Sequence, residues 1–235
     1  MDRLRQLHDA GVSIWLDTLS RDLLTSGEFQ TLVDDSSVTG ATSNPTIFAT
    51  AIRSADSYDA QVRARLSAGQ SDPQALFFDL ALDDVRSAAD VLRPVYDGSH
   101  GRDGFVSFEC TPDLADDTDA TIEQALVLWG RLDRPNVMIK VPATAAGVGA
   151  IEELTAEGVN VNVTLLFARS RYDEVIDAYL TGIERRAAAG EAVDTIASVA
   201  SFFVSRVDAS ADEQLPDRSP LRGRIAVANA KLAYQ

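Results

Sequence analysis

VMIKVP, residues 137–142, is an apolar segment that one charged side chain, Lys140, interrupts. Continuous apolar runs of this length are typical of strands buried on both faces, as in parallel sheets. A lysine inside such a strand is unusual, because an ammonium group loses its hydration when it is buried. The segment therefore predicts a parallel α/β fold, and it makes Lys140 the first candidate for a chemical role.

Similar apolar segments and amphipathic stretches alternate along the rest of the chain. The further strand candidates are Val12–Asp17, Val38–Thr42, Phe105–Glu109, Asn160–Leu165 and Ser198–Phe203. The helical patterns are Asp72–Leu92, Thr118–Leu132, Ala145–Ala156, Ser170–Ala189 and Leu221–Tyr234, and the polar stretch Asp208–Arg218 is typical of a loop. Asp72 before Pro73 predicts an N-cap, and Ser170 with Asp173 predicts a capping box. Alternating strands and helices predict parallel strands with crossover helices.

Two architectures fit this alternation, a doubly wound open sheet and a closed β/α barrel. A dinucleotide-binding sheet shows G-x-G-x-x-G after its first strand, whereas here Asp17–Ser20 follows that strand without a glycine. No G-x-x-x-x-G-K-[ST] segment occurs either. We therefore predict a single domain over residues 1–235, a TIM-type parallel β/α barrel. Only six of its eight strands are evident, so we interpret the barrel as incomplete at its C-terminal end.

Charge and composition exclude several classes of function. The formal net charge is −15, with a pI of about 4.4, which opposes binding to nucleic acids and anionic membranes. No apolar run reaches the roughly 18 residues of a membrane span, and no signal peptide is recognisable, so we expect a cytoplasmic protein. One cysteine and two separated histidines predict neither an internal disulfide nor a structural metal site.

Polar residues follow or end each predicted strand. In a β/α barrel the active site lies at the carboxyl ends of the strands, so these residues are expected to share one rim. They are Asp17, Ser43, Asn44, Glu109, Lys140, Asn162, Thr164 and Ser201, one or two from each strand.

Lys140 has two interpretations. As a strand-end lysine, it extends its ammonium group to water along its apolar stem. As a catalytic group, it is held among apolar neighbours that disfavour the ammonium form, and a neutral amine attacks carbonyl carbons as Schiff-base lysines do. The other polar residues on the predicted rim favour the catalytic interpretation.

The two carboxylates on the rim also have alternatives. Glu109 is either a solvated strand end or a group that holds and activates water near the lysine, and Thr164 could share that water. Asp17 is either the N-cap of the following helix or a general base for a sugar hydroxyl.

The binding candidates have structural alternatives as well. Asn44 precedes Pro45, and Asn-Pro is a common turn. Asn162 and Ser201 either satisfy backbone groups or bind substrate. Arg206 is either a surface arginine or a clamp for a phosphate group.

Several of these segments together resemble one enzyme family. TGATSNPT (residues 39–46) resembles the first transaldolase signature, and VMIKVPAT (137–144) resembles the signature around the transaldolase Schiff-base lysine. NVNVTL (160–165) and SFFVSR (201–206) are similar to further transaldolase segments, and SIWLD (13–17) with Ser20 and Arg21 resembles the actinobacterial-type branch. The resemblance extends from about residue 3 to the end of the chain.

This resemblance implies a set of roles. Lys140 forms the imine, Asp17 is the acid/base in carbon–carbon bond cleavage, and Glu109 with Thr164 positions the catalytic water. Asn44, Asn162 and Ser201 bind hydroxyls of the dihydroxyacetone unit, Phe203 lines the site and Arg206 binds phosphate. The implied transferase moves dihydroxyacetone from sedoheptulose 7-phosphate to glyceraldehyde 3-phosphate in the non-oxidative pentose phosphate pathway. No cofactor or metal is implied, because the imine is the electron sink.

The chain departs from the family in length and in two local features. Family members continue for a further seventh and eighth strand, so we interpret the chain as the larger N-terminal part, whether a truncated piece, a frameshifted product or a shortened paralogue. Cys110 and Thr111 stand where the family has Val and Asp, and Asp208–Pro220 is shorter than the family's connection. A lysine-type aldolase that cleaves fructose 6-phosphate, and an inactive barrel fragment that binds a partner, stay as alternatives. An open strand edge also predicts a homo-oligomer.

Overall fold

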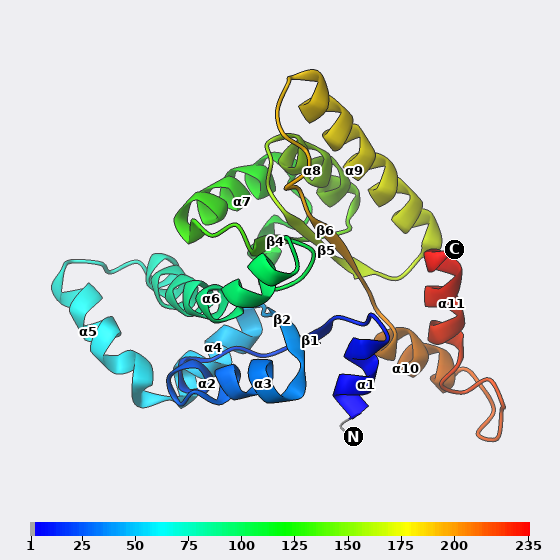
Figure 1. The fold of residues 1–235 in the computed structure, drawn as a ribbon, viewed down its shortest axis with the longest axis horizontal. Coiled ribbons are helices and arrows are strands. Elements are labelled where there is room, and N and C mark those ends of the chain that lie inside the picture. The colour runs from blue at the N-terminus through cyan, green and yellow to red at the C-terminus, as the bar shows by residue number, and fades with distance from the viewer. Residues whose placement is uncertain (1–2) are drawn as a thin grey trace. The chain divides into compact units, whose positions relative to one another are not determined.

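The computed structural model describes residues 3–235 and contains six strands, all close to the predicted segments (Figure 1). They are β1 (Ile14–Leu16), β2 (Val38–Thr42), β3 (Val106–Glu109), β4 (Val137–Pro142), β5 (Val161–Leu166) and β6 (Ser198–Phe202). The strands are ordered in one sheet as they are in the chain. β1 pairs in parallel with β2, β2 with β3, and β5 with β6.

Helices connect these strands. They are α1 (Arg3–Asp9), α2 (Arg21–Thr25), α3 (Glu28–Ser36), α4 (Pro45–Ser54), η1 (Asp56–Tyr58), α5 (Asp59–Ser67), α6 (Pro73–Gly98), η2 (Pro112–Leu114), α7 (Thr118–Leu132), α8 (Ala145–Ala156), α9 (Arg169–Ala188), α10 (Ser205–Glu213) and α11 (Ile225–Tyr234). None of the helices described combines the length and apolar composition of a membrane span. Sequential parallel strands with helical crossovers confirm the predicted α/β fold of TIM type, with six strands in the described residues.

The chain folds as two compact units, which we describe separately. Unit 1 comprises the chain up to Cys110 together with Val127–Ile139. Its core forms around the long helix α6, which buries Leu82, Val85 and other apolar side chains. Gly40 on β2 lies directly against the Trp15 ring, where an added Cβ would come within 2.5 Å of the ring. A glycine is therefore needed beside this tryptophan.

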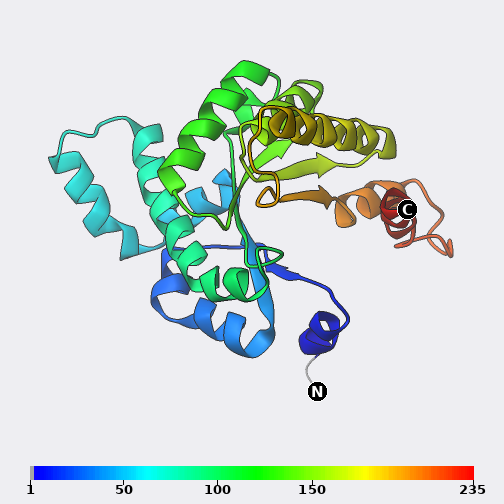
Figure 2. The ribbon, with the colours of Figure 1, turned by 45° about the horizontal axis from the view of Figure 1, so that its top comes forward.

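Unit 2 comprises Thr111–Leu126 and Lys140–Gln235. Its helices α8 and α9 run side by side in both views (Figures 1 and 2). Their close approach occurs at Gly182, where an added Cβ would lie 2.6 Å from the carbonyl oxygen of Glu152. α8 begins with a side-chain cap, because Thr144 Oγ1 accepts a hydrogen bond from the N–H of Gly147 at 2.9 Å.

Three local predictions were wrong. The stretch Asp208–Arg218 is not wholly a loop, because residues up to Glu213 belong to α10, whose half-buried face includes the polar residues Asp208 and Asp212. The capping box at Ser170 does not form: α9 already begins at Arg169, and its N-cap is Ala168. β1 and β6 are not buried on both faces, since none of their residues is fully buried.

Candidate active site

The sequence-predicted site residues divide between the two units. Glu109 ends β3, Ser201 is the last residue but one of β6, and Asp17, Ser43, Asn44, Phe203 and Arg206 follow their strands, but Lys140, Asn162 and Thr164 lie within β4 and β5, so not all of them end a strand as predicted. Unit 1 carries Asp17, Asn44 and Glu109, and unit 2 carries Lys140, Asn162, Thr164, Ser201, Phe203 and Arg206.

Lys140 is the one residue of β4 that is not fully buried. Its neighbours Ile139 and Val141 are 0% exposed, and Lys140 itself is half-buried. A strand packed this tightly leaves its backbone little freedom, so the direction of the lysine stem is fixed by the core. The sequence contains only one other lysine, Lys231, which is exposed on α11.

Asn162 and Ser201 meet across the β5–β6 pair. Ser201 Oγ donates a hydrogen bond to Asn162 Oδ1 at 2.7 Å. Asn162 is 1% exposed, so this bond sets the orientation of a buried amide. The structure thus brings together two of the residues that were predicted to bind substrate hydroxyls, through a direct side-chain contact that the sequence did not reveal.

A bulge at the end of β5 sets the position of Thr164. The carbonyl oxygen of Thr164 accepts a hydrogen bond from the N–H of Ala143 at 2.8 Å, and its side chain is buried. The β5–β6 register shifts between Val163 and Leu166, and Leu165 has a positive φ of 58°. Positive φ is rare for a residue with a Cβ, and bulges of this kind re-aim side chains at the ends of strands.

Phe203 and Arg206 form a stack at the start of α10. The Phe203 ring is stacked on Phe167 with centroids 5.2 Å apart, and the guanidinium carbon of Arg206 lies 4.5 Å from the Phe203 centroid. The N–H of Phe203 donates to the carbonyl oxygen of Leu166 at 2.9 Å. An arginine over an aromatic ring is held in one orientation while its other face stays open to solvent. Arg206 is exposed to solvent in this way.

In unit 1, Asn44 is the N-cap of α4. Its Oδ1 accepts a hydrogen bond from the N–H of Ile47 at 3.0 Å, and Pro45 occupies the first helical position. Asn44 therefore has the structural role that was its alternative, in the turn that starts a helix. It does not exclude binding, since the cap uses the side-chain oxygen and leaves the amide N–H groups to face elsewhere.

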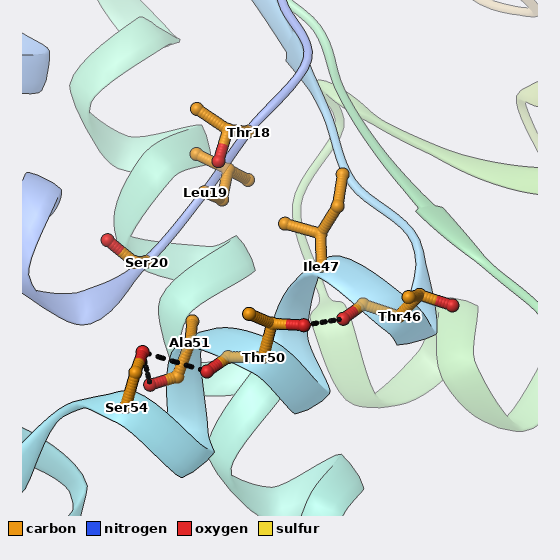
Figure 3. A pocket seen from close by; sticks show the side chains of 8 residues that line it. All are labelled: Thr18, Leu19, Ser20, Thr46, Ile47, Thr50, Ala51 and Ser54. Carbon is orange, nitrogen blue, oxygen red and sulfur yellow. Dashed lines mark hydrogen bonds between the residues drawn. The ribbon is translucent and has the colours of Figure 1, made fainter.

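Asp17 directly follows β1 and is exposed, and it is not the N-cap of the next helix. That cap is Ser20, whose Oγ accepts from the N–H of Leu23 at 3.2 Å. The segments that follow Asp17 and Asn44 face each other across a pocket of about 350 Å³ (Figure 3). Its lining residues are Thr18, Leu19, Ser20, Thr46, Ile47, Thr50, Ala51 and Ser54.

Glu109 ends β3 and is half-buried. The next residue, Cys110, is 3% exposed, and burial, with a smaller contribution from the charge of Glu109, raises the pKa of its thiol to about 12. Cys110 is therefore a protonated packing group near neutral pH.

Sequence reasoning missed a pair of hydroxyls in unit 1. Thr42 and Ser107 are register partners in the β2–β3 pair, and Ser107 Oγ donates to Thr42 Oγ1 at 2.8 Å. They precede Asn44 and Glu109 by two residues. Ser107 and Glu109 both lie in β3, where side chains two residues apart point to the same face. This spacing was the signal in the sequence that could have identified them.

Comparisons with known proteins agree with the predicted resemblance. Residues 14–235 match the family described as Transaldolase/Fructose-6-phosphate aldolase. Transaldolases of Mycobacterium bovis (strain BCG / Pasteur 1173P2) and Mycobacterium tuberculosis (strain ATCC 25618 / H37Rv) are each 53% identical over 237 residues. The transaldolase of Saccharopolyspora erythraea is 51% identical over 234 residues. Each alignment covers 98% of this chain but 63% of the relative, so the chain spans less than two thirds of their length.

A crystal structure from Coccidioides immitis, assigned as a fructose-1,6-biphosphate aldolase, covers 98% of this chain and 89% of its own, at 13% identity and a TM-score of 0.33. A TM-score this low does not establish a common fold. The family match over residues 14–235 does establish descent, and the chain belongs to the transaldolase/fructose-6-phosphate aldolase family.

Proposed function

We propose that the chain carries the covalent centre of a transaldolase, in which the Lys140 amine forms an imine with the carbonyl carbon of a ketose phosphate. The observation that carries this proposal is the position of Lys140, half-buried on β4 between two residues that are 0% exposed. The packed β4 backbone fixes the direction of the lysine stem, and a lysine amine held in a fixed position is a candidate nucleophile toward carbonyl carbons.

The proposed reaction uses the carboxylates of Asp17 and Glu109 to move protons. Asp17 takes the proton from the substrate hydroxyl next to the bond that breaks, and the electron pair of that carbon–carbon bond flows into the imine. An aldose phosphate leaves, and a dihydroxyacetone enamine stays on Lys140. Glu109 and Thr164 hold the water that enters and leaves during imine formation and hydrolysis. Addition of the enamine to an acceptor aldehyde reverses these steps.

The remaining candidates bind the substrate. Asn44, Asn162 and Ser201 hold hydroxyls of the dihydroxyacetone unit, and the 2.7 Å bond from Ser201 to Asn162 supports a shared role for the last two. Phe203 lines the site, and Arg206, oriented over that ring, binds phosphate. The proposed donor and acceptor are sedoheptulose 7-phosphate and glyceraldehyde 3-phosphate, in the cytoplasmic non-oxidative pentose phosphate pathway.

A second candidate function is cleavage of fructose 6-phosphate without an acceptor. The description of the family supports it, because it names fructose-6-phosphate aldolase beside transaldolase. The two reactions share the imine and the carbon–carbon cleavage, and they differ in the fate of the enamine. Release of free dihydroxyacetone from fructose 6-phosphate alone would favour the aldolase.

Borohydride reduction in the presence of fructose 6-phosphate tests the covalent centre. Reduction converts an imine into a stable amine, so the expected result is a mass adduct that peptide mapping locates at Lys140. Lys231 is the internal control, since it is the other lysine of the chain and is exposed. A folded chain that gives no adduct at Lys140 would contradict the proposal and favour the alternative of a β/α fragment that binds a partner.

A further inference from the structure

The segment that carries Asp17 is short, so its position is fixed by the elements at its two ends, β1 and α2. On its amino-terminal side, Leu16 pairs with Ala41 in the β1–β2 ladder. Asp17 is exposed, Leu19 is 0% exposed, and Ser20 caps α2. The position of the Asp17 carboxylate therefore depends on what fixes the start of α2, only four residues later.

Arg21, the first residue of α2, is held by both its backbone and its side chain. Its N–H donates to Tyr58 Oη at 2.9 Å, and its Nε donates to Asp84 Oδ1 at 2.8 Å. Nη1 donates to Gln61 Oε1 at 2.6 Å, and Nη2 donates to the Leu80 carbonyl oxygen at 3.3 Å. The guanidinium carbon also lies 4.6 Å from the Tyr58 ring centroid.

Tyr58 closes this arrangement into a ring of hydrogen bonds. Its Oη accepts from the Arg21 N–H and donates to Asp84 Oδ2 at 2.7 Å. Tyr58 is 1% exposed and Asp84 is 2% exposed, on a stretch of α6 that otherwise packs in the core. Burial raises the pKa of the Asp84 carboxyl, and the hydrogen bonds from Tyr58 and Arg21 oppose that shift.

A buried ionic cluster of this kind is not explained by stability alone. Well-packed apolar residues of similar volume are often at least as stable as a buried ion pair, because they avoid the loss of hydration. What the ion pair and its fork of hydrogen bonds add is a single defined geometry for the groups they join. Here the joined groups are the start of α2, η1 and the middle of α6.

We infer that Arg21 is a positioning residue: the Arg21–Tyr58–Asp84 cluster holds the β1–α2 segment and thereby fixes the direction of the Asp17 carboxylate. The inference rests on the proposed function, since it assumes that Asp17 moves the proton during carbon–carbon cleavage. Arg21 does not touch the substrate in this account. Its contribution is to restrict the directions that the Asp17 carboxylate can take.

The proposal separates two steps of the reaction. Imine formation at Lys140 does not use Asp17, so loosening the β1–α2 segment leaves that step almost unchanged. Cleavage requires Asp17 to take the hydroxyl proton as the carbon–carbon bond breaks, and misplacing a catalytic group by about 1 Å costs roughly 100-fold in rate. A variant that loses the cluster should therefore accumulate the uncleaved imine.

Borohydride trapping with fructose 6-phosphate measures both steps in one experiment. The uncleaved imine gives a six-carbon phosphorylated adduct, and the imine formed after cleavage gives a three-carbon adduct. For Arg21→Met we expect the rate of appearance of the three-carbon adduct to fall about 10- to 100-fold, while total adduct at Lys140 changes less than about twofold. Arg21→Lys, which restores the charge but not the planar fork, should recover part of the rate.

Arg63→Met is the matched control. Arg63 lies on α5 with its side chain 75% exposed and pairs with Asp59 at the surface. Its removal changes the net charge by the same amount and should leave both adducts at the wild-type level. Hydrogen exchange of the peptide covering residues 17–25 gives a second readout, and we expect faster exchange in Arg21→Met but not in Arg63→Met.

The outcomes distinguish the inference from the proposed function. A wild-type chain that gives no adduct at Lys140, or no three-carbon adduct, contradicts the proposed function and this inference with it. A wild-type chain that gives both adducts, together with an Arg21→Met variant whose three-carbon adduct appears at the wild-type rate, overturns the inference alone. If Arg21→Met does not fold, the rate of appearance of the three-carbon adduct is measured in Tyr58→Phe instead. That variant keeps the ring and removes only the hydroxyl that accepts the Arg21 N–H.

Discussion

β4 and β6 both deliver candidate residues, but their side chains are held in different ways. In β4 every residue except Lys140 is buried, whereas in β6 none is. β6 is held to β5 by its parallel ladder and by two serine side chains, Ser198 and Ser201, which bond to β5 at 3.0 and 2.7 Å. The comparison indicates that core packing fixes the nucleophile and that hydrogen bonds fix the binding groups, so the two strands should respond differently to substitution.

The largest expected effect is on β4. Lys140→Met removes the amine, so borohydride with fructose 6-phosphate should give no adduct above background, a loss of at least about 1,000-fold. The methionine stem fills similar space in a strand that already contains Met138, so far-ultraviolet circular dichroism should not change. Lys231→Met is the control and should keep the wild-type adduct. Equal adduct in both variants would show that Lys140 is not the nucleophile.

A matched pair of valines tests the difference in packing directly. Val141→Ala on β4 removes two methyl groups from a site that is 0% exposed, and the free energy of unfolding should fall by about 2–3 kcal/mol. Val199→Ala on β6 makes the same change at a half-buried site, where we expect less than about 1 kcal/mol. Urea denaturation gives both values. Equal losses would refute the contrast between the two strands.

Comparing alanine variants of two serines on β6 separates an effect on substrate binding from an effect on stability. Ser201→Ala removes the bond to Asn162, and Ser198→Ala removes a bond to the Val161 carbonyl oxygen. Each leaves a buried acceptor without its serine donor and should cost about 1–3 kcal/mol in unfolding free energy. Only Ser201→Ala should slow adduct formation at low ketose phosphate concentration, by about tenfold, the rate equivalent of about 1.4 kcal/mol. If both variants slowed adduct formation equally, the cause would be a general loosening of β6 and not the loss of a binding group at Ser201.

The smallest expected effect extends the comparison to the end of β3. Burial raises the pKa of Cys110 to about 12 from 9.0. The folded state thus binds the thiol proton more tightly than the unfolded state. The resulting stability is present below pH 9 and is lost as the pH rises toward 12. Between pH 8 and 10 wild type should lose about 1 kcal/mol more than Cys110→Ala in urea denaturation. Identical pH profiles would show that the thiol is accessible.

Much of the fold could be predicted because its elements follow simple periodic patterns. The bounds predicted for β2, α7 and α8 agree with the structure, and α8, for example, begins directly after its N-cap Thr144. α10 was not recognised, because its half-buried face combines Val207 and Ala211 with two acidic residues, Asp208 and Asp212, and so has no continuous apolar stripe.

The site was predictable only in part. The residue types at strand ends are visible in the sequence. Their contacts are not visible, because they join distant positions: Ser201 bonds to Asn162, and Arg21 bonds to Asp84, 63 residues away. The roles of the site residues stay proposals until they are tested.

The most direct test compares the two lysines in the native and the unfolded chain. Peptide mapping after borohydride reduction with fructose 6-phosphate should place the adduct at Lys140 and not at Lys231 in the native chain. In concentrated urea the same mapping should show no preference, because the reactivity of Lys140 comes from its position in the packed β4 strand. A preference for Lys140 that persists in urea, or equal adducts in the native chain, would contradict the account.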